Sequence, residues 1–189
     1  MKLLVITRNH SGFKLALGAD SALLRPGEPV FLPETDNPAF SAVVPAIRIC
    51  RLGFWVRSNF ASYFDAVTLF HYLKPAEEDL PQWLPPYVAD RTFSPGTWQP
   101  LPDDGIISAQ VSRKPLPGHD GQTVAEQFRV SLQELDPEGL IRDLSRQITL
   151  KTGDILIFPD AGTRLRQAEL DSGICADLNG AQVLDIRLK

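Results

Sequence analysis

The side chains that most often do chemistry in proteins are sparse here and scattered along the chain. The 189 residues include three histidines and two cysteines, Cys50 and Cys175. The densest acidic cluster is Glu77-Glu78-Asp79. Adjacent residues of a loop point in different directions, so this cluster is typical of a solvated turn or helix start and would be a poor metal site. The cysteines lack metal-site spacing, which predicts two buried thiols in a reducing cytoplasm.

Two of the histidines and one aspartate are further candidates. His71 lies in an apolar string, where a histidine is more often a buried, hydrogen-bonded core residue than a metal ligand. His119-Asp120 could orient a general base, but its glycine-rich and proline-rich surroundings indicate a turn. Asp160 follows an apolar strand and is the best candidate for a polar pocket residue, with a turn at the strand end as the alternative. The sequence contains no glycine-rich phosphate loop, nucleophile elbow or zinc-ligand spacing.

Composition limits the classes of partner. The formal net charge is -4 and the isoelectric point about 5.4, without any basic run, which disfavours nucleic acids and anionic membranes as partners. No apolar run approaches the length that spans a bilayer, and the apolar start of the chain is too short for a signal peptide. We therefore expect a cytoplasmic protein with one domain over residues 1–189.

Proline and glycine, with 16 and 13 residues, divide the chain into short segments, which favours strands and loops over long helices. Residues 43–52 form the most strand-like segment, with Ile47 and Ile49 on one face and Ala46 and Arg48 on the other. Asn179-Gly180 between two alternating runs predicts a C-terminal hairpin. The expected strands are residues 5–6, 29–33, 43–52, 155–158, 174–178 and 183–188.

Two helices are expected. Residues 58–64 predict a short one, and Asp136-Pro137 predicts the start of a better one, with an N-cap followed by proline at the first helical position. The second helix would bury an apolar stripe made of Leu140, Ile141, Leu144 and Ile148. Residues 75–104 are rich in proline and contain Trp83 and Trp98, which predicts a long ordered loop or covering segment.

Several strings, in the same order over nearly the whole chain, resemble the fumarylacetoacetate hydrolase family. The most specific is Leu150-Lys151-Thr152-Gly153-Asp154-Ile155-Leu156, which resembles the family's Leu-Lys-x-Gly-Asp entry into its core strand. The resemblance implies an α+β, mostly β fold: a mixed, roll-like or barrel-like sheet with a few short helices. The other matching strings are Arg8-Asn9, residues 20–24, residues 48–53, residues 63–68, Ala161-Gly162 and residues 184–186.

The resemblance also implies a chemistry. Members cleave carbon–carbon bonds or decarboxylate β-dicarbonyl acids with Mg²⁺, Mn²⁺ or Ca²⁺, which polarises a substrate oxygen. The family holds the metal with a Glu-x-Glu pair on one strand and a third aspartate. Here the pair is replaced by Ala42-Val43-Val44, and the aspartate position falls at or next to Tyr72. Ala42, Val44 and Tyr72 cannot supply carboxylates, so we expect no metal cofactor.

Other family positions are also changed. The family's Lys-x-Phe-Asp string falls at residues 91–94, where Arg91 keeps the charge type and Ser94 replaces the aspartate. The catalytic histidine and glutamate of hydrolytic members, carried on a lid helix, fall at Phe13 and Ala16. His10 is nearby, at a different offset and without an acidic partner in that segment.

These replacements favour a catalytically inactive pseudoenzyme that acts as a binding or structural module. The alternative is a hydrolase, decarboxylase or tautomerase acting on acylpyruvate-like β-keto acids with a rewired, metal-free site built from residues such as His10, Arg91 or Asp160. The expected partners are a second copy of the chain, an intact paralogue or a small organic acid. If side chains fill the space between Val44, Tyr72 and Asp160, the family's site is closed; an open polar pocket there would favour an enzyme.

Overall fold

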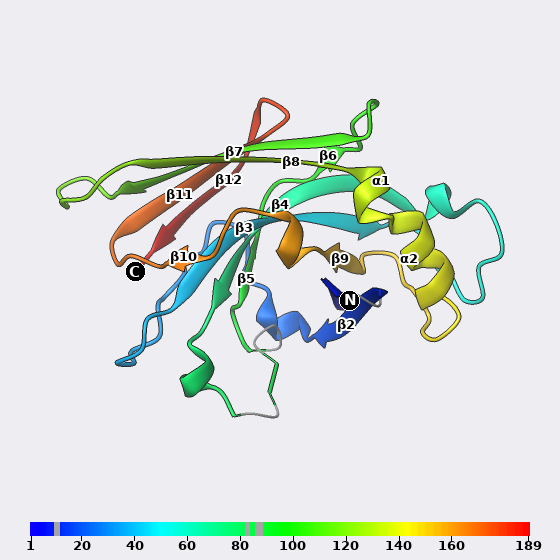
Figure 1. Ribbon diagram of the computed structural model, residues 1–189, viewed down its shortest axis with the longest axis horizontal. Helices are drawn as coiled ribbons and strands as arrows, with labels where there is room; N and C mark the ends of the chain where they lie inside the picture. The colour runs from blue at the N-terminus through cyan, green and yellow to red at the C-terminus, as the bar shows by residue number, and fades with distance from the viewer. Residues whose placement is uncertain (10–11, 82–83, 86–88) are drawn as a thin grey trace.

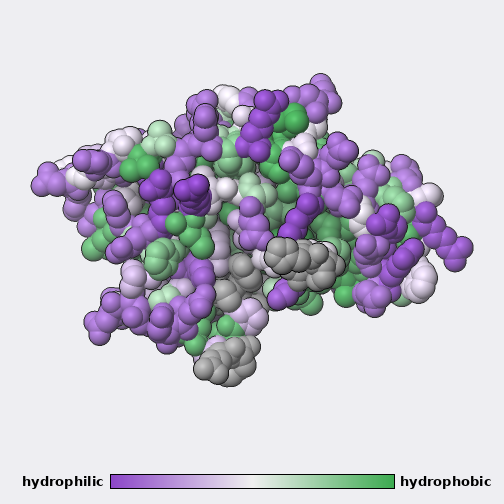
Figure 2. Space-filling model, in the orientation of Figure 1, coloured by the Kyte–Doolittle hydropathy of each residue, from purple (hydrophilic) through white to green (hydrophobic). Residues whose placement is uncertain are grey.

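The computed structural model describes residues 1–9, 12–81, 84–85 and 89–189, and within these ranges the chain folds into two packed β-sheets with short helices at one end (Figure 1). Strands predominate, as the sequence predicted. None of the helices in the described ranges is long and apolar enough to cross a membrane. On the face drawn in Figure 2, hydrophilic side chains predominate and apolar ones form small separate areas.

The larger sheet has eight strands in the order β2-β1-β9-β3-β4-β5, with β10 paired to β3 and β6 paired to β4. It is mixed, because β1 and β9 run parallel while the other pairs run antiparallel. A parallel bridge joins Leu23 to Phe93 of β5, so the chain leaving β2 reaches the opposite edge and the sheet curls into a roll. Its strands are β1 (Leu3–Asn9), β2 (Gly12–Gly18), β3 (Phe40–Ile49), β4 (Phe64–Lys74), β5 (Phe93–Pro95), β6 (Gln99–Pro100), β9 (Ile155–Ile157) and β10 (Arg166–Gln167).

The smaller sheet is antiparallel, with four strands in the order β12-β11-β7-β8. The predicted hairpin is confirmed: Asn179 and Gly180 both have positive φ between β11 and β12, and the Asn179 side chain accepts a hydrogen bond from the Ser108 N–H at 2.8 Å. Strands β7 and β8 were not predicted from the sequence. The strands are β7 (Ile106–Pro115), β8 (Val124–Ser131), β11 (Ser172–Leu178) and β12 (Ala181–Leu188).

Alternation along the strands divides the interior into two apolar regions. Ile47 and Ile49 of β3 face the smaller sheet, and Ala46 faces the inside of the roll, as predicted for this segment. The first region, the intersheet core, lies between the sheets and against α2 (Pro137–Leu144). The second region, the roll interior, is formed by the opposite faces of β1, β3, β4, β5 and β9.

The helix predicted from Asp136-Pro137 is confirmed, although it ends at Leu144 and leaves Ile148 half-buried in the bend that follows. The helix predicted over residues 58–64 is wrong. Asp136 caps α2 through a hydrogen bond from the Gly139 N–H at 3.0 Å, and Leu140, Ile141 and Leu144 are buried. A short helix α1 (Leu132–Leu135) precedes it, closed by a capping box between Ser131 and Glu134. Residues 58–64, expected to be helical, form only a 3-10 turn η2 (Phe60–Tyr63).

The turn η2 is short because Asn59 takes a left-handed conformation, without a side-chain cap, and Phe64 already belongs to β4. Two further expectations are modified. Residues 29–33 contribute only an isolated bridge between Val30 and Leu188, and residues 75–104 include the short strands β5 and β6. The other 3-10 turns within the described ranges are η1 (Asp20–Ala22), η3 (Glu77–Asp79) and η5 (Pro159–Ala161).

The Gly-Asp string ahead of β9 has a structural role. The Asp154 side chain is fully buried and accepts hydrogen bonds from the N–H groups of Lys2 and Lys151, each at 2.8 Å. The Lys2 ammonium lies 2.6 Å from the same carboxylate. Gly153 has a φ of 87°, which closes the turn that brings Lys151 to the carboxylate. Asp154 therefore joins the start of β1 to the turn before β9.

Asp154→Ala should lower the free energy of unfolding by about 3 kcal/mol, because it leaves two partly buried N–H groups and an ammonium without their acceptor. Urea unfolding followed by circular dichroism measures this change. Asp143→Ala is a matched control, since its ion pair with Arg142 is exposed and should contribute less than about 0.5 kcal/mol. Equal losses in the two variants would contradict the role assigned to Asp154.

Candidate functional site

The positions where the family resemblance places metal ligands meet in the roll interior. Ala42 of β3 lies opposite Tyr72 of β4 in the antiparallel register, and Val44 lies opposite Phe70 on the same face. The exposed fractions of Ala42, Val44 and Tyr72 are 1%, 0% and 2%. Two segments distant in sequence thus bring three of the predicted site residues together.

Aromatic side chains fill the space around these positions. The Phe93 ring stacks on Tyr72 with centroids 5.2 Å apart, and Phe70 packs against Phe93 at 6.3 Å. Trp98 meets Phe70 edge-on at 6.0 Å. The other buried members of the roll interior are Leu3, Val5, Ala22, Ala46, Ile155 and Ile157. The donor set does not fit a hard divalent cation, because aliphatic and aromatic side chains replace the carboxylates such an ion requires.

The turn after β9 packs tightly against the same part of β3. The N–H of Val43 donates to the Thr163 hydroxyl at 2.9 Å, and the Thr163 N–H donates to the Val43 carbonyl at 2.8 Å. A Cβ atom on Gly162 would overlap that carbonyl and the Val44 Cα, so glycine permits this approach. Among the described residues, no three His, Cys, Asp or Glu side chains are grouped so that they could hold a metal ion.

The structure does not bring the remaining predicted residues into this cluster. Asp160 is exposed, and its carboxylate accepts a hydrogen bond from the Arg8 N–H at 3.0 Å, which fits the turn alternative. Arg91 is exposed with a φ of 59°, and its N–H donates to the Ser21 carbonyl at 3.1 Å. Phe13, which the resemblance placed on a lid helix, lies instead on strand β2, beside α1 and α2. His10 lies outside the described residues.

Ser94 faces away from the roll interior, toward the smaller sheet. It pairs directly with His71, on the opposite side of the strand from Phe93 and Tyr72. His71 is fully buried, and Ser94 is 3% exposed. Neither the two His71 ring nitrogens nor the Ser94 hydroxyl has a hydrogen-bond partner among the described residues. The expected burial of His71 is confirmed, but the expected hydrogen bond is not found within the described residues.

Arg113 of β7 is the charged neighbour of this pair. Its guanidinium donates to the Ser41 hydroxyl at 2.6 Å and to Glu126 at 3.2 Å. Burial, reinforced by the positive charge of Arg113, lowers the pKa of His71 to about 3. His71 is therefore neutral at physiological pH, and its low basicity makes it a poor general base there.

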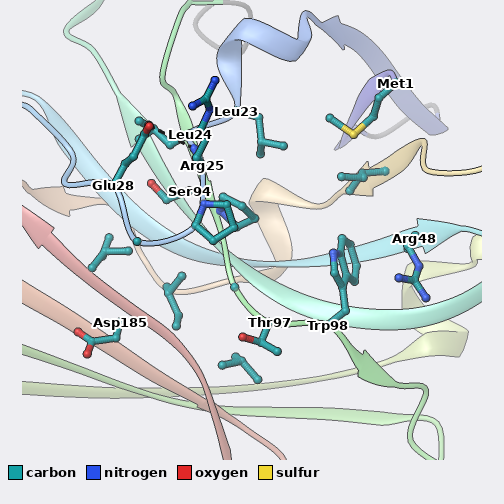
Figure 3. A pocket seen from close by; sticks show the side chains of 18 of the residues that line it. Met1, Leu23, Leu24, Arg25, Glu28, Arg48, Ser94, Thr97, Trp98 and Asp185 are labelled. Carbon is teal, nitrogen blue, oxygen red and sulfur yellow. Dashed lines mark hydrogen bonds between the residues drawn. The ribbon is translucent and has the colours of Figure 1, made fainter.

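A cleft of about 1090 Å³ opens between the roll and β12 (Figure 3). Arg25 and Glu28 come from the loop after η1, Trp98 from the segment before β6, and Asp185 from β12. This cleft was not predicted from the sequence, although Ser94, one of the candidate residues, lies in its lining. The cleft depends on pairing between residues distant in sequence, which no local pattern reveals.

The cleft wall near Trp98 carries a paired charge. The Arg48 guanidinium donates to both carboxylate oxygens of Asp65, at 3.0 and 2.8 Å, and lies 5.5 Å from the centre of the Trp98 ring. The hydrogen bond from Arg48 to Asp65 raises the pKa of the guanidinium, so its charge is permanent and already balanced.

Comparison with known proteins identifies the architecture. No family model matches the sequence, and no curated protein sequence is similar to it. Solved structures do match. A 5-carboxymethyl-2-hydroxymuconate delta-isomerase from Mycobacterium smegmatis is 18% identical, with a TM-score of 0.76 over 99% of this chain and 78% of the other. A 2-hydroxyhepta-2,4-diene-1,7-dioate isomerase from Mycobacterium marinum is 18% identical, with a TM-score of 0.75 over 99% and 73%.

A third similar structure carries the family name. It is a fumarylacetoacetate hydrolase family protein from Yersinia pestis, 16% identical, with a TM-score of 0.71 over 100% of this chain and 92% of the other. A mixed roll packed on an antiparallel sheet is thus shared along the whole length of the chain. The chain has the fumarylacetoacetate hydrolase fold, which confirms the fold predicted from the sequence resemblance.

The unpaired His71 predicts a specific loss of stability in acid. Below pH 6.5 an unfolded chain protonates this side chain, while the folded state keeps it neutral until about pH 3. The contribution is therefore complete above pH 6.5 and falls by about 1.4 kcal/mol per pH unit below it. Urea unfolding at intervals from pH 7.5 to 5 should show this slope.

His71→Leu should remove the slope and leave stability at pH 7.5 equal or greater, since it replaces an unpaired buried polar group by an apolar one. His119→Gln is the control, because it removes a histidine side chain that is 50% exposed rather than buried. An unaltered slope in His71→Leu would contradict the assignment.

Proposed function

We propose that this chain is a pseudoenzyme of the fumarylacetoacetate hydrolase fold, which acts as a binding or structural module without metal-dependent catalysis. The observation that carries the proposal is the packing of Ala42, Val44 and Tyr72 in the roll interior. These side chains occupy the positions expected for three carboxylates, and all are at most 2% exposed.

Electrostatics supports this proposal. A divalent cation in an apolar interior loses its hydration, at a cost of several kcal/mol per charge, and needs anionic oxygens to offset it. The Tyr72 hydroxyl is the polar atom at the three positions, and a neutral phenol supplies no compensating charge. The aromatic packing around it also leaves the interior filled by side chains.

The alternative is a metal-free hydrolase, decarboxylase or tautomerase for acylpyruvate-like acids. Among the residues suggested for such a site, the Asp160 carboxylate accepts a hydrogen bond from the Arg8 N–H, and the Arg91 N–H donates to the Ser21 carbonyl. His10 lies outside the described residues. These contacts supply neither a paired acid and base nor an enclosed anion site. The geometry therefore favours binding over catalysis.

Calorimetric titration with MgCl2 and MnCl2 tests the proposal directly. We expect no binding in the micromolar range, because the carboxylate set is replaced. EDTA titrated with the same metal stocks is the control for the measurement. Micromolar binding that disappears when a defined pocket is mutated would overturn the proposal.

A turnover assay distinguishes the pseudoenzyme from the metal-free enzyme. Acylpyruvate and oxaloacetate should remain unconverted by the protein with or without EDTA. EDTA-resistant turnover that falls in a His10→Ala or Asp160→Asn variant would establish the metal-free enzyme instead. A Glu138→Gln variant, changed on the helix α2, provides the matched control.

A further inference from the structure

The cleft beside β12 exposes a short stretch of sheet edge. On the side of β12 away from β11, the Val183 carbonyl accepts from the Thr97 N–H at 2.7 Å, and the Arg187 carbonyl accepts from the Val30 N–H at 2.8 Å. Main-chain groups of every second strand residue point to the same side. The N–H and carbonyl of Asp185, midway between these residues, therefore point to the same edge.

Asp185 lies opposite Cys175 of β11. In an antiparallel pair, hydrogen-bonded and non-hydrogen-bonded residue pairs alternate, and Asp185 belongs to a non-hydrogen-bonded pair. Within the described part of the chain, no main-chain group from another segment reaches Asp185 on its outer side. The cleft lies along this stretch, because residues 182–186 line it together with the loop before Val30 and the segment before Trp98. A donor and an acceptor of β12 thus face the cleft.

The gap has a defined length. From Val183 to Arg187 the strand advances about 13 Å, which matches roughly three to four residues of an extended chain. The segments containing Thr97 and Val30 close the two ends by their own hydrogen bonds to β12. A longer strand cannot run past these ends in the plane of the sheet, so the site suits a short peptide rather than a segment within a protein chain.

The charges lining the cleft select for a cation. Asp20, Glu28 and Asp185 contribute three carboxylates, while Arg25 and Arg48 contribute two guanidinium groups. The Arg48 charge is balanced by Asp65, which is not part of the lining. The carboxylates therefore outnumber the remaining guanidinium group, that of Arg25, and Asp185 and Glu28 lie on opposite sides of the cleft (Figure 3). Leu23, Pro95 and Val183 supply apolar surface between them.

We infer that this cleft binds a short, extended, basic peptide, which adds to the free edge of β12 at Asp185. The peptide main chain exchanges hydrogen bonds with the Asp185 N–H and carbonyl, as in strand addition to an exposed sheet edge. Its basic side chain lies among the carboxylates of Asp20, Glu28 and Asp185. This peptide would be the ligand of the proposed binding module, and the inference rests on that proposed function. It does not depend on whether the roll interior binds a metal.

The probe is the capped tripeptide acetyl-Ala-Lys-Ala-amide, titrated into the full-length protein and followed by amide chemical shifts in NMR. Saturable shifts should appear at Asp185, Val183 and Arg187. The matched peptide with glutamate in place of lysine should bind at least about five-fold more weakly, because its charge repels the carboxylates. Equal binding of the two peptides would overturn the charge assignment.

Two variants at position 185 distinguish the contribution of the main chain to peptide binding from that of the side chain. Asp185→Pro removes the N–H on the free edge, where proline leaves the hydrogen bonds to β11 intact, and should weaken binding about five-fold or more relative to Asp185→Ala. Glu28→Gln should weaken binding of the lysine peptide, while Glu138→Gln, on α2, should not. Asp185→Pro binding as tightly as Asp185→Ala would overturn edge addition.

A second measurement keeps the test decisive if Asp185→Pro does not fold. The tripeptide N-methylated at lysine lacks the donor that faces the Asp185 carbonyl, and should bind the wild-type chain about five-fold more weakly. A twelve-residue peptide with the same central sequence should bind no more tightly than the tripeptide. Tighter binding of the longer peptide, or no binding of the tripeptide at millimolar concentration, would overturn the inference, whereas metal binding in the calorimetric test would overturn only the proposed loss of catalysis.

Discussion

The buried carboxylate of Asp154 is the interaction on which the arrangement of the larger sheet depends. The carboxylate accepts hydrogen bonds from the N–H groups of Lys2 and Lys151 and pairs with the Lys2 ammonium. The main-chain carbonyl of Asp154 accepts a hydrogen bond from the Ile49 N–H at 2.8 Å. One residue thus fixes the start of β1, the turn before β9 and the end of β3. A charge buried this deeply is stable only when every such bond is made, which gives the junction a single geometry.

The position of β9 then determines what each face of the roll can do. β9 lies between β1 and β3, so Ile155 and Ile157 face the roll interior while Leu156 faces the intersheet core. The turn that leaves β9 reaches β3 at Val43 through Thr163. The positions of Ala42 and Val44 are therefore set by the same scaffold that would aim ligands at an ion, although their side chains cannot bind one.

Local patterns predicted the elements whose determinants are local. Asp136-Pro137 specifies the start of α2, Asn179-Gly180 specifies the hairpin, and the pleat separates Ile47 from Ala46. Contacts between residues distant in sequence could not be predicted from local patterns. The alternation around His71 places it inside, but whether a hydrogen-bond partner lies opposite depends on β5 and β7, which are distant in sequence. The cleft at Asp185 likewise requires Val30 and Thr97 to meet one edge of β12.

The two interiors illustrate opposite solutions for a polar position in a fold. In the roll interior, the positions where the family resemblance implies polar ligands carry side chains that pack, and burial of Phe70 and Phe93 contributes stabilisation of about 2 to 3 kcal/mol each. In the intersheet core, the His71 ring nitrogens and the Ser94 hydroxyl have no hydrogen-bond partner in the described part of the chain, which costs stability. A filled apolar site gains stability from its packing and needs no ligand. The proposed peptide site lies instead at the periphery, at the edge of β12, where a ligand can replace water at little cost to the core.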